Sequence, residues 1–145
     1  MASSSAFLYG AALFQPDRRS VTPTARLQAT LDLMHEIDRV ARPADAVVSA
    51  WFRAHRSIGD RDRGAIAELL YALLRHHARL GWWLAQHGRP DGPRNRLLAW
   101  LALDGGKTPD QVKALFNGQK FAPAPLKEHE RALLVKLQGS GVDHP

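Results

Sequence analysis

The chain has 145 residues, of which 45% are apolar and 23% charged, proportions that are ordinary for one globular domain with a core. It contains no cysteine, which excludes disulfides, thiolate metal sites and cysteine nucleophiles. Basic residues outnumber acidic ones by 20 to 14, for a formal net charge of +6. The early apolar stretch from Ala6 to Phe14 is too short to span a membrane and lacks the basic start of a signal peptide, so we expect a cytoplasmic protein with no membrane partner.

Apolar residues recur at helical spacing almost throughout, and no alternating run is long enough to predict a strand. The first helix is expected to start at Pro23, because Thr22 can cap it and proline fits the first helical position. A second helix is expected to open at Pro43.

The third predicted helix is capped at Asp60 and has the longest apolar stripe of the chain. Its pattern allows it to continue to Leu84 despite Gly81, and His77 falls on the apolar stripe, so we expect His77 to be a hydrogen-bonded core residue.

Three further helices are predicted after the loop at 87–93. The fourth contains the apolar run 97–103, and the fifth begins at the capping box Thr108-Pro-Asp-Gln111. The last runs roughly from Lys127 to Gln138. The sequence therefore predicts an all-α fold, a compact bundle of about six helices.

The net charge is concentrated in one window, Arg53 to Arg96, which holds nine Arg and four acidic residues and so carries +5 of the +6. Arg presents a planar fork that matches pairs of phosphate oxygens, so such a surface is typical of a protein that binds a polyanion, above all nucleic acid. A composition bias is the alternative, since the chain has 15 Arg and 22 Ala but only 5 Lys.

Several arginines are candidate phosphate ligands. Four bracket the turn expected between the second and third helices, and two lie four residues apart on the helix that follows, where they would share a face. One more lies near the start of the first helix, whose N-terminus adds a positive dipole. The candidate RNA-binding residues are Arg26, Arg53, Arg56, Arg61, Arg63, Arg75 and Arg79. Asp62 beside Arg63 has two interpretations: it orients that guanidinium for a phosphate, or it neutralises it.

No residue pattern predicts catalysis. The sequence Gly105-Gly-Lys-Thr108 lacks the strand and the upstream glycine of a phosphate-binding loop, and is better explained as a helix end followed by a cap. His76 and His77 are adjacent, so on a helix they point about 100° apart and do not form the i, i+4 pair that metals favour. We therefore expect no catalytic, cofactor-binding or metal-binding residues in this chain.

Five segments together resemble the N-terminal domain of the Sun/Fmu (RsmB-like) family, ribosomal RNA 5-methylcytosine methyltransferases. The resemblance runs from about Thr22 to Leu137 and is carried by Thr22-Pro-Thr-Ala-Arg26, Ala50-Trp-Phe-Arg53, Asp62 to Arg75, Leu115-Phe-Asn-Gly118 and Ala122-Pro-Ala-Pro-Leu126. It implies a NusB-like helical bundle that binds RNA, shared with the antitermination factor NusB.

The resemblance also implies a division of labour. In the family, a following domain binds S-adenosylmethionine and supplies two cysteines for attack on cytosine, whereas this chain has no cysteine and cannot run that chemistry. We therefore expect residues 1–21 to be a leader outside the core, 22–138 the RNA-binding domain, and 139–145 the start of a linker to a methyltransferase domain.

The sequence-level hypothesis is an accessory domain, not itself an enzyme, whose partners are ribosomal RNA and its own methyltransferase domain. The alternatives are a free-standing NusB-like factor in antitermination or ribosome assembly, and a scaffold that braces the methyltransferase domain without binding RNA.

Overall fold

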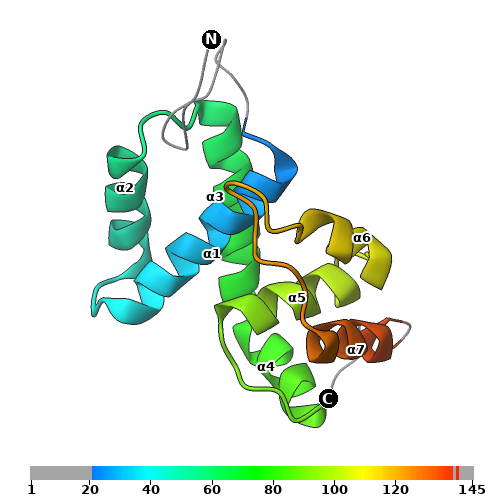
Figure 1. Ribbon diagram of the computed structural model, residues 1–145. Coiled ribbons are helices and arrows are strands. Elements are labelled where there is room, and N and C mark those ends of the chain that lie inside the picture. Colours follow the sequence, from blue (N-terminus) through cyan, green and yellow to red (C-terminus); the bar gives the residue numbers. More distant parts are fainter. Residues whose placement is uncertain (1–20, 139, 141–145) are drawn as a thin grey trace. The chain divides into compact units, whose positions relative to one another are not determined.

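The computed structural model describes residues 21–138 and 140, and this part of the chain consists of seven helices and no strand (Figure 1). The all-α prediction is therefore confirmed. The helices are α1 (Pro23–Arg39), α2 (Ala44–Ala54), α3 (Asp60–Arg75), α4 (His77–Gln86), α5 (Pro93–Leu103), α6 (Pro109–Leu115) and α7 (Glu128–Leu137). The expected leader (1–21) apart from Val21, and the expected linker (139–145) apart from Ser140, lie outside the described residues.

The chain divides into two compact units, and the boundary between Leu70 and Tyr71 falls within α3. In the first unit α2 packs against α1 (Figure 1). Thr22 Oγ1 accepts a hydrogen bond from the N–H of Ala25 at 3.1 Å, and Pro23 is the first helical residue, so the predicted start is confirmed. The buried apolar residues of this unit are Ala25, Leu27, Ala29, Leu31, Leu33, Met34, Val47, Val48, Trp51, Ile58, Ile66 and Leu70.

The predicted continuation of the third helix to Leu84 is wrong, which is why residues 21–138 form seven helices where about six were expected. His76 has φ −102° and ψ 18°, and this single residue separates α3 from α4. These angles lie outside the α-helical values, so the residues after His76 do not continue the stripe of α3. The core placement of His77 is also wrong: its side chain is 51% exposed, and its Nε2 lies 3.5 Å from Asp91 Oδ2.

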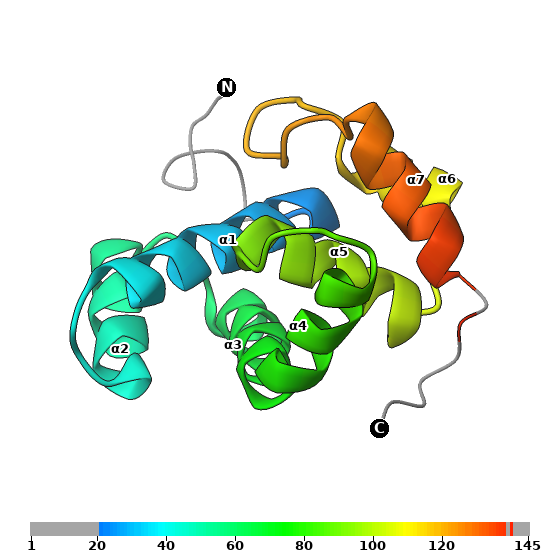
Figure 2. The same cartoon turned by 90° about the horizontal axis from the view of Figure 1, so that it is seen from below.

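The second unit is built around α5, which is buried on almost every side and packs against α4, α6 and α7. Figure 2 shows α4 and α7 on different sides of α5. The predicted capping box of α6 is confirmed: Gln111 N–H donates to Thr108 Oγ1 at 3.1 Å, and Thr108 N–H donates to Gln111 Oε1 at 2.9 Å. Among residues 21–138, no helix is long and apolar enough to cross a membrane.

Candidate nucleic-acid interface

The turn between α2 and α3 is held by contacts of His55 and Ile58. The His55 ring stacks on Trp51 with centroids 3.8 Å apart, and its Nδ1 lies 2.7 Å from the Trp51 carbonyl oxygen. Ile58 is 1% exposed and its N–H donates to the His55 carbonyl at 3.1 Å. A buried anchor on each side of the turn therefore holds in place the backbone that carries Arg53 and Arg56.

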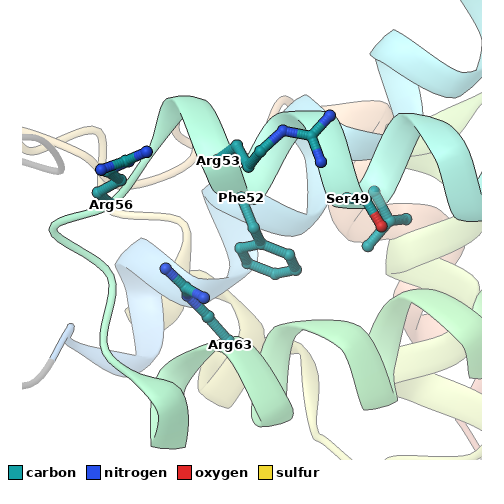
Figure 3. A pocket seen from close by; sticks show the side chains of 6 residues that line it. Ser49, Phe52, Arg53, Arg56 and Arg63 are labelled. Carbon is teal, nitrogen blue, oxygen red and sulfur yellow. The ribbon is translucent and has the colours of Figure 1, made fainter.

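An open pocket of about 540 Å³ lies beside this turn (Figure 3). We call it the α2–α3 pocket, and its lining contains three guanidinium groups, one aromatic ring, one hydroxyl and no carboxylate. The lining residues are Val48, Ser49, Phe52, Arg53, Arg56 and Arg63. A concave surface with positive charge and no acidic neighbour attracts anions more strongly than the same charges spread over a flat surface.

We refer to Arg53, Arg56, Arg61 and Arg63 as the turn arginines. Arg53, Arg56 and Arg61 are exposed. None of these three forms a hydrogen bond or an ion pair with any residue that the structure describes. Arg61 lies on the first turn of α3, outside the pocket lining. These three side chains therefore keep all their donors for a ligand.

Arg63 is half-buried, and only the Nε of its guanidinium forms a hydrogen bond within the described part of the chain. Its Nε donates to the Ile58 carbonyl at 3.0 Å, and its Cζ lies 5.8 Å from the centroid of the Phe52 ring. Figure 3 shows Arg63 reaching from α3 toward Phe52, which extends from α2. The two terminal nitrogens of Arg63 make no hydrogen bond within the described part of the chain.

The partner of Asp62 is Arg26, so neither sequence interpretation of Asp62 is correct. Asp62 is 3% exposed; its Oδ1 accepts from Arg26 Nε at 2.9 Å and its Oδ2 from the Val21 N–H at 2.9 Å. Arg26 is thus part of an internal ion pair that joins α1 to α3, and its role as an RNA contact stays a prediction. Val21, assigned to the leader from the sequence, is tied to the first unit by this bond.

The expected pairing of Arg75 and Arg79 on one helix face is wrong, because the interruption at His76 places them on different helices. Arg75 is exposed and has no partner among the described residues. Arg79 places one terminal nitrogen 2.6 Å from each carboxylate oxygen of Asp104, which joins α4 to the end of α5. Of the two, only Arg75 has a guanidinium available for phosphate.

Two more arginines of the basic window are also held internally. Arg96 is 4% exposed and its Nε lies 2.9 Å from Asp91 Oδ1. Arg94 holds both carboxylate oxygens of Glu130, at 2.7 and 3.0 Å, and its Cζ lies 4.9 Å from the centroid of the Phe116 ring. Much of the charge in the window therefore stabilises the second unit and does not form a free basic surface.

The same contacts set the protonation of Glu130. Burial raises the pKa of Glu130, but hydrogen bonds from Arg94 and from the Lys127 N–H, with the positive charges of Arg94 and His129, outweigh burial and hold the pKa below its ordinary value. Glu130 is therefore a structural anion at neutral pH, and its pKa is not tuned for proton transfer there.

Sequence reasoning missed Ser49 and Phe52 as pocket residues. A signal was present: Phe52 and Arg53 follow Ser49 by three and four residues, which puts a hydroxyl, a ring and a cation on one side of α2. Mixed polar and apolar character at that spacing is typical of a binding face.

Within residues 21–138 and 140, no group of three or more histidine, aspartate or glutamate side chains could hold a metal ion. Comparison of the chain with protein-family models, curated proteins and solved structures finds no match. The resemblance to the Sun/Fmu family therefore remains a prediction from the sequence motifs, and the α2–α3 pocket is the feature from which function can be argued.

Proposed function

We propose that this chain is an RNA-binding accessory domain of a ribosomal RNA cytosine-5 methyltransferase, acting in the cytoplasm, and that the turn arginines dock the RNA. One observation carries the proposal: three guanidinium groups line one pocket that contains no carboxylate, and a fourth lies exposed at the start of α3. Arg side chains without an internal partner bind phosphate oxygens in pairs, and phosphate contacts supply most of the sequence-independent affinity for RNA.

Binding and chemistry are separate in this proposal. The chain has no cysteine, so attack on cytosine and the binding of S-adenosylmethionine belong to the methyltransferase domain that the motif resemblance implies. The residues of this chain position the RNA, and the methyltransferase domain modifies it.

Salt dependence gives the proposal a quantitative test. If each of the four turn arginines neutralises one phosphate of a single strand, log Kd changes with log salt with a slope of about 2.8. Affinity then falls about 50-fold between about 50 and about 200 mM salt. Replacing Arg53, Arg56 and Arg61 with Gln leaves one contact, and the same change of salt should cost only about 3-fold.

Fluorescence anisotropy with a labelled fragment of 16S-type ribosomal RNA measures both slopes. The matched control replaces Arg42, Lys113 and Lys136 with Gln, which removes the same charge from exposed residues that belong neither to the turn nor to the pocket lining. The proposal requires the turn variant to lose affinity and slope while the control variant stays near the parent chain. Equal losses in the two variants would show that net charge alone attracts the RNA, and no binding by the parent chain would favour the scaffold alternative.

A further inference from the structure

Phe52 and Arg63 are two planar groups that face each other but are held by other contacts. The Phe52 ring packs edge-on against Trp51, with centroids 5.3 Å apart and an interplanar angle of 83°. Trp51 is 9% exposed, so the ring against which Phe52 packs is itself buried. The guanidinium of Arg63 is held by its hydrogen bond to the Ile58 carbonyl. Neither group depends on the other for its position.

The distance between them is near the outer limit of a direct contact, because a cation and an aromatic ring attract each other within about 6 Å of the ring centroid. Carbon atoms in van der Waals contact are about 3.5–4.0 Å apart, so a guanidinium stacked directly on a ring lies at about that distance. A flat base inserted between two planes needs twice that spacing, about 7 Å. The observed 5.8 Å lies between the two values, and a movement of about 1 Å by Arg63, which has one hydrogen bond to break, would admit a base.

We propose that the α2–α3 pocket is a subsite for one unpaired nucleotide of RNA. Its base stacks between Phe52 and the face of the Arg63 guanidinium, whose terminal nitrogens at the edge keep the phosphate contact counted above, and its flanking phosphates also meet Arg53 and Arg56. The pocket volume of about 540 Å³ is within the range of about 300–1,000 Å³ that small-molecule sites occupy. The inference rests on the function proposed above, because it names the form of RNA that the same pocket selects.

Charge and stacking make different demands on the RNA. A duplex offers phosphates to the turn arginines as readily as a single strand does, so the arginines alone discriminate little between the two. The bases of a duplex, however, are stacked on both faces and closed to a side chain, whereas an unpaired base has a free face for an aromatic ring. Preference for unpaired RNA must therefore come from Phe52 and Arg63.

The test compares an unstructured single strand with a duplex of the same sequence, using the whole chain and anisotropy at one salt concentration. Base stacking on an aromatic side chain contributes about 1–3 kcal/mol, so Phe52→Leu should weaken single-strand binding by about 5- to 150-fold and leave duplex binding unchanged. Phe52→Tyr keeps the ring and should keep the preference. Circular dichroism of both variants checks that the helices are retained.

The outcomes separate this inference from the proposed function. Single-strand affinity that survives Phe52→Leu, or equal affinity for duplex and single strand in the parent chain, would overturn the nucleotide subsite while RNA docking by the arginines stands. Absence of binding to either RNA by the parent chain would overturn both. Loss of single-strand affinity in Phe52→Leu with rescue by Phe52→Tyr would support the subsite.

Discussion

Removal of Arg94 should destabilise the second unit more than removal of an exposed ion pair in the same unit, such as Arg131–Asp110. In addition to its two bonds to Glu130, a terminal nitrogen of Arg94 donates to the carbonyls of Ala124 at 2.9 Å and Pro125 at 3.1 Å. One guanidinium therefore fastens α5 to α7 and to the segment that leads into α7. Arg94→Ala would leave a carboxylate that is 5% exposed without its main counter-charge.

The expected magnitude follows from the burial of the two groups. Removing one partner of a fully buried ion pair costs about 3–5 kcal/mol. The Arg94 side chain is 26% exposed, so water already screens the pair, and we expect Arg94→Ala to lower the free energy of unfolding by about 2–3 kcal/mol. Arg94→Lys keeps the charge but not the fork, and should lose about 1–2 kcal/mol.

The effect should depend on pH. Because the pKa of Glu130 is lower in the folded chain, its ionisation stabilises the fold at pH values above its ordinary unfolded pKa, and this stabilisation is lost as the pH falls through the folded pKa. Without Arg94, the burial of Glu130 would instead favour the protonated, neutral form of its carboxyl group. The difference in the free energy of unfolding between the parent chain and Arg94→Ala should therefore be largest near pH 7. It should become smaller as the pH falls below the ordinary glutamate pKa.

Urea denaturation followed by circular dichroism at several pH values measures this difference. Arg131→Ala is the matched control: it breaks a pair with Asp110 in the same unit, but those side chains are 43% and 83% exposed, so the loss should be about 0–1 kcal/mol. Equal losses for the two variants, or a loss at Arg94 that does not change with pH, would refute the reasoning.

Three other substitutions test the local geometry, each by urea denaturation of the variant and the parent chain. Gly118 has φ +71° and an added Cβ would lie 2.7 Å from Pro125 side-chain carbons, so Gly118→Ala should destabilise by about 1–3 kcal/mol; an unchanged midpoint would contradict this. Gly64 lies inside α3 with open space around an added Cβ, so Gly64→Ala should stabilise by about 0.5–1 kcal/mol, and a destabilised variant would count against the helix assignment. Asp62→Asn removes the counter-charge of Arg26 and should destabilise by about 1–3 kcal/mol, whereas a neutral result would make that buried pair irrelevant to stability.

Local signals were predictable from the sequence, and distant partners were not. Thr22 and Thr108 cap their helices as predicted, because a cap depends on atoms two or three residues away. The break at His76 has no proline or glycine to mark it. Likewise, nothing near Asp62 in the sequence indicates that its partner is Arg26, 36 residues earlier.

The same limit governs the candidate site. The sequence places a basic window between Arg53 and Arg96, but the second unit uses Arg79, Arg94 and Arg96 for pairs with acids of that unit. Which arginines remain without an acidic partner depends on tertiary contacts. A count of charges along the sequence does not reveal those contacts. The turn arginines were identified from their position between two predicted helices, while the pocket and Phe52 required the structure.

We expect RNA to contact the turn arginines and not the internally paired arginines. NMR of the isotope-labelled chain resolves arginine Nε–H signals, and titration with an unpaired ribosomal RNA fragment reports on each. The signals of the turn arginines should shift and broaden with RNA, while those of Arg79 and Arg94 should stay in place. Shifts confined to Arg79 and Arg94, or unchanged turn arginines at RNA concentrations where binding is saturated, would contradict it.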